Sequence, residues 1–387
     1  MEKPIYLNYA ATSINKPKEM LDAVCQYLTD DAQMSYNRSL ASDVGTDIIY
    51  KAREEVAQFF NVKDSSHVVF TENITMSLNM VLGGLLEEGD HVIVSSMEHN
   101  AVMRPLTLLK KKLGIEITLL PSTKEGVVHP KDLEKECGAN TKLLVLTGAS
   151  NVLGTILPVK ELFKVAKAKN VITILDSAQT AGFRPIDVER DFIDVLNFTG
   201  HKSLQALSGI GGFALTEEVA RKMKPWLVGG TGNMSHLLEQ PETMPEKFES
   251  GTLNAVGILS LMESIRWINK IGMNNIAAHQ MELTEKFLQG LENLPVQVLG
   301  TKDIHQTVPV VSLTCDKYTA SDLSYQLFEQ YNILTRCGLH CAPSAHQVAG
   351  TYPDGAVRFS FGYGTTVKEV ETTLNALREL LDGWWEI

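Results

Sequence analysis

Long apolar runs are scarce in this 387-residue sequence. The most apolar uncharged stretch lies between Lys142 and Lys160, and it contains Ser150, Asn151 and two threonines. This stretch is therefore better interpreted as a strand and a loop than as a membrane span. The first residues, MEKPIYLNYAATS, lack the apolar core of a secretory signal. We therefore predict a cytoplasmic protein with no membrane-spanning segment.

The sequence also contains few cysteines and fewer basic than acidic residues. The cysteines are odd in number and thinly spread, which does not fit a disulfide framework: Cys25, Cys137, Cys315, Cys337 and Cys341. Lysine and arginine total 35 against 46 aspartates and glutamates, so the net charge is −11. The field of the chain would repel a phosphate backbone or an anionic lipid surface. We predict neither nucleic acid nor membrane as a partner.

The rest of the composition is that of a globular protein. Hydrophobic residues make up 44% and charged residues 21% of the chain. A chain of this length is too long for one ordinary core, so two domains are expected. Short apolar runs alternate with helical patterns, which predicts an α/β fold with a mostly parallel sheet covered by helices. The predicted strands begin at His91, Lys142, Val171, Val195 and Gly211.

A change in composition marks the predicted domain boundary. A segment rich in glycine, proline and polar residues at about 229–254 precedes a long helical stretch at about 256–291. We assign residues 16–260 to a large domain, and residues 1–15 with 261–387 to a small α+β domain. In the latter, Thr366 and Glu369 predict a capping box at the start of the last helix.

Polar side chains follow two of the predicted strands. Asp176 and Gln179 stand in LDSAQ, and His201 and Lys202 stand in FTGHK. The carboxyl ends of parallel strands converge on the ligand crevice of an open sheet. Taken singly, Asp176 is equally well a helix cap and Lys202 a surface lysine. Together they match pyridoxal phosphate, which needs a lysine amine for a Schiff base and an acid that keeps its ring nitrogen protonated.

The phosphate of such a cofactor needs hydroxyls and the backbone N–H groups of a helix N-terminus. Asn73 and Thr75 begin a helical pattern, and Thr199 and His201 lie beside the lysine. An ordinary N-cap is the competing interpretation of the first pair. His99 can stack on the pyridine ring, although a lone histidine fits many other roles.

Six segments, MEHNAV, SNVLGT, LDSAQT, TGHK, FESGT and RCGLHCAP, occur in this order. They resemble the class V aminotransferase-like, fold type I pyridoxal phosphate family, and within it the cysteine desulfurase and selenocysteine lyase branch. The resemblance runs from YLNYAAT to VRFSFG. It implies a homodimer in which Lys202 forms the Schiff base, Asp176 binds the ring nitrogen and Gln179 the ring hydroxyl, while His99 stacks on the ring.

The same resemblance implies the remaining contacts of the cofactor. Asn151 would contact the hydroxyl side of the ring or the substrate. Thr75, Thr199 and His201 would hold the phosphate. Thr252 of FESGT would join them from the partner subunit.

The segment RCGLHCAP distinguishes the branches of the family. Cys341 matches the catalytic cysteine position, and a transaminase needs no thiol there. Arg358 would hold the substrate carboxylate with its planar fork, and Arg336 the loop or the carboxylate. The implied reaction converts L-cysteine to L-alanine, leaves a persulfide on Cys341 and passes the sulfur to an acceptor protein.

Other interpretations stay open at this point. A selenocysteine lyase would act on L-selenocysteine and pass selenium to an acceptor, and an aminotransferase of the same family is a further alternative. A non-catalytic scaffold is disfavoured by the intact Lys202. Cys337, His340 and His346 could join Cys341 at a metal, but no second cysteine pair has zinc-ribbon spacing, so we predict no metal. Cys337 is interpreted as structural rather than as a redox partner of Cys341.

Overall fold

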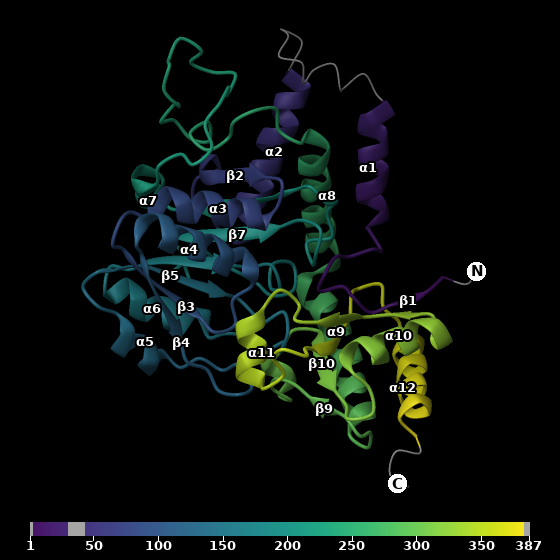
Figure 1. Ribbon diagram of the computed structural model, residues 1–387. Helices are drawn as coiled ribbons and strands as arrows, with labels where there is room; N and C mark the ends of the chain where they lie inside the picture. The colour runs from purple at the N-terminus through teal and green to yellow at the C-terminus, as the bar shows by residue number, and fades with distance from the viewer. Residues whose placement is uncertain (1–2, 30–42, 383–387) are drawn as a thin grey trace.

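A large sheet organises most of the chain. The computed structural model describes residues 3–29 and 43–382, and in it seven strands lie in the order β2-β8-β7-β6-β5-β3-β4 (Figure 1). The predicted strands are present as β3 (His91–Ser95), β5 (Thr141–Thr147), β6 (Ile172–Asp176), β7 (Val195–Thr199) and β8 (Gly211–Leu215). The edges are β2 (Val68–Thr71) and β4 (Glu116–Leu120). The sheet is mostly parallel, as predicted, because β8 alone runs in the direction opposite to the other strands.

Side chains of the strands alternate between two covered faces. In β5, Leu144 and Leu146 pack on one face, and Leu143 and Val145 on the other. The first face carries α1 (Lys18–Thr29), α2 (Asp43–Phe60), α5 (Pro130–Glu136), α6 (Val159–Ala168) and α8 (Ala255–Ile271). The second carries α3 (Ile74–Leu85), α4 (Asn100–Leu113) and α7 (Glu217–Lys222). Burial on both faces explains why the strands are continuous apolar runs.

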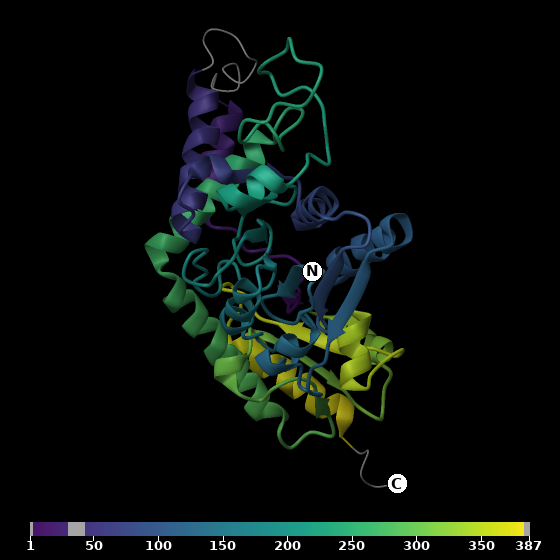
Figure 2. The ribbon, with the colours of Figure 1, turned by 90° about the vertical axis from the view of Figure 1, so that its left-hand side faces the viewer.

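A smaller unit surrounds a second sheet. Its antiparallel order is β12 (Arg336–Gly338), β13 (Ala356–Ser360), β10 (Val310–Thr314) and β9 (Gln297–Val298). The helices α9 (Met273–Leu291), α10 (Ala320–Tyr331) and α12 (Val367–Leu381) share its core, and α11 (Pro343–Ala349) follows β12. The strand β1 (Ile5–Tyr6) pairs with β11 (Ile333–Leu334), so the N-terminal segment lies against this unit, beside α10 in Figure 1. Figure 2 shows the yellow C-terminal part of the chain in the lower half of the view.

The helical stretch predicted at 256–291 is two helices rather than one. Gly272 separates α8 from α9 with φ 88°, in the left-handed region that glycine adopts without strain. All the buried apolar side chains of α8 belong to the core of the large sheet, whereas most of those of α9 belong to the core of the small one. We therefore propose Gly272, in place of residue 260, as the break between the domains; residues 1–2 and 383–387 of the proposed small domain lie outside the described residues.

Two local predictions are confirmed. Thr366 and Glu369 form the capping box at the start of α12. Residues 223–254 contain no helix or strand, and a loop within this segment extends from the body of the molecule (Figure 1). Within the described ranges, none of the helices combines the length and the apolar character that crossing a membrane requires.

Candidate active site

A cavity of about 590 Å³ lies at the carboxyl ends of β5, β6 and β7. Its wall combines these strand ends with the N-terminus of α3 and with side chains of the smaller unit. The predicted site residues that line it are Lys202, His99, Asp176, Gln179, Asn151, Thr75, Thr199, His201, Arg336 and Arg358. Cys341 and Thr252 are the two predicted site residues outside this lining. The structure thus brings most of the set together, and their chemical roles stay predictions.

Asp176 and Lys202 both line this cavity, and the charge of each affects the pKa of the other. Asp176 ends β6, is buried, and accepts a hydrogen bond from the backbone N of Ala178 at 2.9 Å. Burial raises the pKa of Asp176, and the Ala178 N–H and the Lys202 charge oppose this rise. Burial lowers the pKa of Lys202 to about 8 against the opposing charge of Asp176. An amine with that pKa both accepts and releases protons near neutrality.

Another group of residues in the lining of this cavity suits a phosphate group. Thr199 ends β7, and its buried hydroxyl has no hydrogen-bond partner within the described residues. The N-terminus of α3, capped by Asn73, lines the same cavity. Burial, then the charges of Lys202 and Lys16, lower the pKa of His201 to about 4, so this imidazole is neutral. An orphaned hydroxyl beside a helix N-terminus fits an anion.

His99 and Gln179 are held in fixed orientations. His99 is the N-cap of α4, and its Nδ1 accepts a hydrogen bond from the backbone N of Ala101 at 3.0 Å. Burial, with the Lys202 charge, lowers the pKa of His99 to about 4. Gln179 Nε2 donates to the carbonyl of Ala10 at 3.2 Å. A neutral imidazole locked as a helix cap fits the predicted stacking role.

Arg358 is a buried cation that has no carboxylate partner among the described residues. It lies on β13 with 1% of its surface exposed. Its Nη2 donates to Asn8 Oδ1 at 3.0 Å and its Nη1 to the Asn151 carbonyl at 3.1 Å, while Nε has no partner in the described chain. Burial, reinforced by Arg336, lowers the pKa of Arg358 to about 9. A buried guanidinium held only by neutral groups fits an anionic substrate group.

Cys341 stands on the loop between β12 and α11. Its Sγ lies 3.6 Å from Nη2 of Arg336, and its carbonyl accepts a hydrogen bond from the backbone N of Asn100 at 2.7 Å. Its charge also acts on the pKa of Lys202, which places the thiol within electrostatic range of the cavity. The Cys337 Sγ lies 3.9 Å from a hydroxyl on α10. Both thiols are free.

Thr252 is exposed and lines a separate hollow near α3 and β2. One chain alone therefore does not bring it into the predicted phosphate site. Its predicted reach into the site of a partner subunit stays a prediction.

Sequence reasoning missed Asn8 and Glu98. Asn8 holds Arg358, and its only sequence signal is its place in YLNYAAT. Glu98 is fully buried in MEHNAV; its Oε1 accepts a hydrogen bond from the backbone N of Thr147 at 2.8 Å, and its Oε2 has no partner among the residues described. Thr147 is the register partner of Asp176 across β5 and β6, so Glu98 lies behind the acid of the site.

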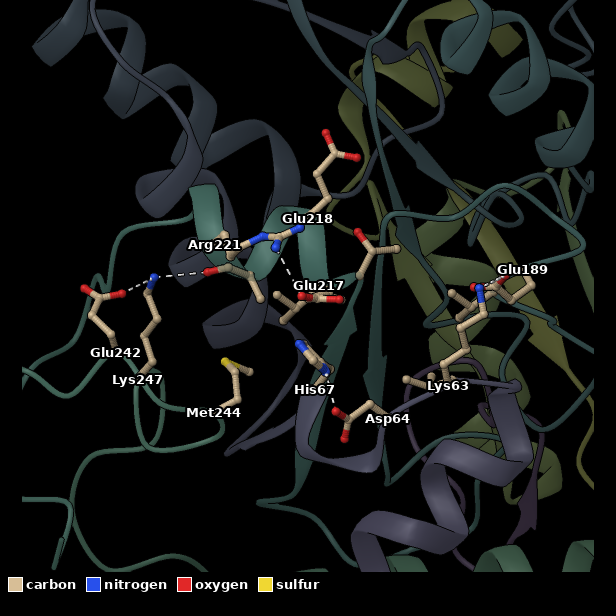
Figure 3. Close-up of a pocket in the computed structure, with 15 residues that line it drawn as sticks. Lys63, Asp64, His67, Glu189, Glu217, Glu218, Arg221, Glu242, Met244 and Lys247 are labelled. Carbon is tan, nitrogen blue, oxygen red and sulfur yellow. Dashed lines mark hydrogen bonds and ion pairs between the residues drawn. The ribbon is translucent and has the colours of Figure 1, made fainter.

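A larger cavity of about 870 Å³ lies beside Leu215, the last residue of β8 (Figure 3). Because β8 is antiparallel to β7, this cavity is at the end of the sheet away from the carboxyl ends of β5, β6 and β7. Its charges are already satisfied by ion pairs that join Lys63 to Glu189, Lys247 to Glu242 and Arg221 to Glu217. It contains none of the predicted site residues. In the described part of the chain, no group of three His, Cys, Asp or Glu side chains is placed to hold a metal. The smaller cavity is therefore the candidate active site.

Comparisons with known proteins bear on the family and the fold of the chain. The family model described as aminotransferase class V matches residues 5–373. The chain is 31% identical over 390 residues to a probable cysteine desulfurase of Pyrococcus abyssi, covering 98% of this chain and 95% of that protein. The apo cysteine desulfurase of Thermococcus onnurineus matches with a TM-score of 0.91, 31% identity and coverage of 98% and 95%. A cysteine desulfurase of Escherichia coli matches with a TM-score of 0.87, 28% identity and the same coverage.

Proposed function

The chain belongs to the aminotransferase class-V family, and from this membership and the geometry of its cavity we propose that it is a pyridoxal phosphate-dependent cysteine desulfurase. The family and the fold type predicted from the sequence are thereby confirmed. The observation that carries the proposed reaction is the thiol of Cys341, which lies 3.6 Å from Arg336, a residue that lines the same cavity as Lys202 and Asp176. An aminotransferase uses such a lysine and acid but has no step that needs the thiol.

The residues present fit the cofactor. When bound, pyridoxal phosphate supplies an aldehyde that condenses with amines and a ring that takes up the electron pair left at the substrate Cα. The unpartnered Thr199 hydroxyl and the N-terminus of α3 support a bound phosphate, and the buried Asp176 supports a protonated ring nitrogen. The remaining assignments are Lys202 to the aldehyde, His99 to the ring face, Gln179 to the ring hydroxyl, and Thr75 and His201 to the phosphate.

Lys202 and Asp176 divide the proton handling. With a pKa lowered to about 8, the Lys202 amine takes the proton from the substrate Cα and returns it later in the reaction. The Asp176 carboxylate holds the proton on the ring nitrogen, and that cation stabilises the charged carboxylate that burial disfavours.

Arg358 and Cys341 handle the two ends of the substrate. Arg358, oriented by Asn8 and Asn151, binds the α-carboxylate of L-cysteine. The Cys341 thiolate, beside the Arg336 guanidinium, attacks the substrate sulfur: an S–S bond forms, the Cβ–S bond breaks, and its electron pair stays on the substrate carbon. Protonation of that carbon gives L-alanine and leaves a persulfide on Cys341.

Three further parts of the proposal concern the setting of the reaction. The partly exposed loop of Cys341 supports transfer of the sulfur to an acceptor protein. The position of Thr252 outside the cavity of its own chain supports a homodimer. We place the enzyme in the cytoplasm, where a thiol that must accept sulfur stays reduced.

Cys341→Ser tests the proposed reaction. The variant should keep the visible absorption of the bound cofactor and still bind L-cysteine, but form alanine at least ~100-fold more slowly, because the attacking thiolate is lost. The matched control Cys337→Ser should stay within about twofold of the wild type, since that thiol contacts only α10. Mass spectrometry after a pulse of cysteine should find the added sulfur on the peptide that contains Cys341.

The same assay separates the alternatives when alanine, pyruvate and keto acid are all quantified. Wild-type alanine formation by Cys341→Ser would refute the desulfurase. Activity of that variant confined to L-selenocysteine would favour a lyase, since selenium leaves more readily. A stoichiometric keto acid would favour an aminotransferase.

A further inference from the structure

Two buried histidines have no part in the proposed chemistry: one lies in the loop of Cys341 and the other on α11, which follows that loop. His340 precedes the cysteine with 2% of its surface exposed, and His346 on α11 is fully buried. Their rings stack with centroids 5.5 Å apart and an interplanar angle of 20°. His340 Nδ1 lies 3.3 Å from His346 Nε2. The two side chains therefore meet each other rather than the cavity.

The partners at each end fix which nitrogen of each ring is protonated. His340 Nε2 lies 3.1 Å from the carbonyl of Arg336, which can only accept, so Nε2 donates. In a neutral ring His340 Nδ1 is then the acceptor, and the donor to it is His346 Nε2. His346 Nδ1 is left to accept from the hydroxyl of Thr351, 2.8 Å away. The result is one ordered chain of donors from Thr351 to Arg336.

Both imidazoles are neutral at the pH at which the enzyme works. Burial, with the charge of Arg358 next, lowers the pKa of His340 to about 3, and burial lowers that of His346 to about 4. The donor order is thus retained at neutral pH. Because the chain ends on a backbone carbonyl, it is unsuited to passing protons to the cavity.

The hydrogen-bonded chain from Thr351 to Arg336 lies beside a backbone segment that is strained. His340 and Cys341 have φ of 50° and 59°, in the left-handed region that side chains other than glycine seldom adopt. Two hydrogen bonds from the large domain hold their carbonyls: Asn151 Nδ2 to His340 and the Asn100 backbone N to Cys341, both at 2.7 Å. The donor chain fixes the same segment from the other side, through Arg336.

We propose that His340 and His346 are positioning residues that hold the Cys341 loop in its left-handed conformation and keep Sγ beside the Arg336 guanidinium. The inference rests on the proposed function, because it names the groups that prepare the thiol for sulfur transfer. Arg336 is fixed twice, by the hydrogen bond to its carbonyl and by its contact with Sγ. Loss of the hydrogen-bonded histidine chain should therefore change the reactivity of the Cys341 thiol without changing the cofactor site.

The test compares His346→Leu, which removes both ring nitrogens, with His346→Gln, which offers a donor and an acceptor in their place. The control is His279→Leu, a histidine on α9 whose Nε2 lies 3.0 Å from the Thr365 carbonyl, away from the loop. Each holoenzyme is alkylated with iodoacetamide across a pH series, and peptide mass spectrometry follows Cys341 with Cys337 as the internal reference. Visible absorption, kcat and KM for alanine formation are measured in parallel.

In His346→Leu the alkylation of Cys341 should slow about tenfold relative to Cys337 across the pH series, because the thiolate no longer lies beside the Arg336 guanidinium. Its kcat should fall about tenfold with KM within about twofold and the visible band unchanged. His346→Gln should recover most of both, and His279→Leu should match the wild type. A wild-type alkylation profile in His346→Leu overturns the proposal, and so does equal impairment of the Gln and Leu variants.

A second variant decides the case in which His346→Leu does not fold. Thr351→Val removes only the first donor of the chain, and it should slow the alkylation of Cys341 in the same way; an unchanged profile overturns the proposal. Alkylation needs no turnover. A wild type that makes no alanine from cysteine would therefore refute the proposed function, while the Cys341 profiles would still decide whether the histidines hold the loop.

Discussion

The carboxyl of Glu98 shows how burial decides a protonation state behind the active site. Burial raises the pKa of Glu98 from 4.5 to about 8, and hydrogen bonds from Ser95 and Thr147 oppose the rise. The nearby charge of Asp176 adds to the rise, because two carboxylates side by side disfavour each other. At neutral pH Glu98 is therefore mostly a neutral acid, which leaves Asp176 as the carboxylate for the proposed contact with the ring nitrogen.

Glu98→Gln should flatten the pH dependence of stability. A raised pKa in the folded state means that folding takes up a proton, so the stabilisation from Glu98 is complete below about pH 4.5 and is lost as pH rises toward about 8. In denaturant titrations of the cofactor-free protein, the wild type should lose up to about 1.4 kcal/mol per pH unit more than the variant across this window. Glu72→Gln, at an exposed carboxyl of the same cavity, is the control and should follow the wild type. Parallel curves for wild type and Glu98→Gln would refute the assignment.

At the scale of elements, a buried ion pair ties α2 to the segment FESGT. Arg53 Nη1 and Nη2 donate to the two carboxylate oxygens of Glu249 at 2.8 and 2.9 Å. Glu249 Oε1 also accepts from the backbone N of Phe70 in β2 at 2.8 Å. Both charged side chains are buried, so this fork positions the chain three residues before Thr252.

Breaking the ion pair between Arg53 and Glu249 should lower the stability of the folded protein. Glu249→Ala should lower the free energy of unfolding by about 3–5 kcal/mol, because it leaves the Arg53 charge buried without an anionic partner. The double variant Arg53→Met with Glu249→Leu should recover most of that loss, since apolar groups of similar size need no partner. Urea titration measures both. A loss below about 1 kcal/mol in Glu249→Ala would show that the fork is solvated and does not anchor the segment.

Burial in the folded protein decides how well the sequence predicts each strand. The inner strands were predictable because burial on both faces makes them continuous apolar runs, whereas edge strand β4 begins with exposed Glu116 and was missed. The antiparallel direction of β8 leaves no mark in its own composition. Asp176 and Lys202 are predictable because they lie at the carboxyl ends of buried strands: Asp176 is the last residue of β6, and Lys202 lies three residues after β7. The contact of Asn8 with Arg358 joins positions 350 residues apart, and only tertiary packing creates it.

At the scale of the whole molecule, one region looks incomplete in a single chain. Large apolar side chains are exposed along the segment before FESGT, including Trp226, Val228 and Leu238, the last fully exposed. With Thr252 outside the cavity of its own chain, these exposed apolar side chains support the proposed homodimer, because contact with a second copy would remove them from water. A dimer of this kind predicts that each active site is completed by the other chain.

Thr252→Ala should weaken cofactor retention about 10- to 100-fold, the effect of losing one hydrogen bond to a charged phosphate. Mixed dimers with a Lys202→Ala chain then show which subunit Thr252 serves. If it acts across the interface, a dimer of one Lys202→Ala chain and one Thr252→Ala chain contains one intact site and regains about half of the wild-type activity. If Thr252 acts within its own chain, both sites stay defective and the mixture gains nothing. Sedimentation of the active species checks the assembly, and an active monomer would contradict the shared site.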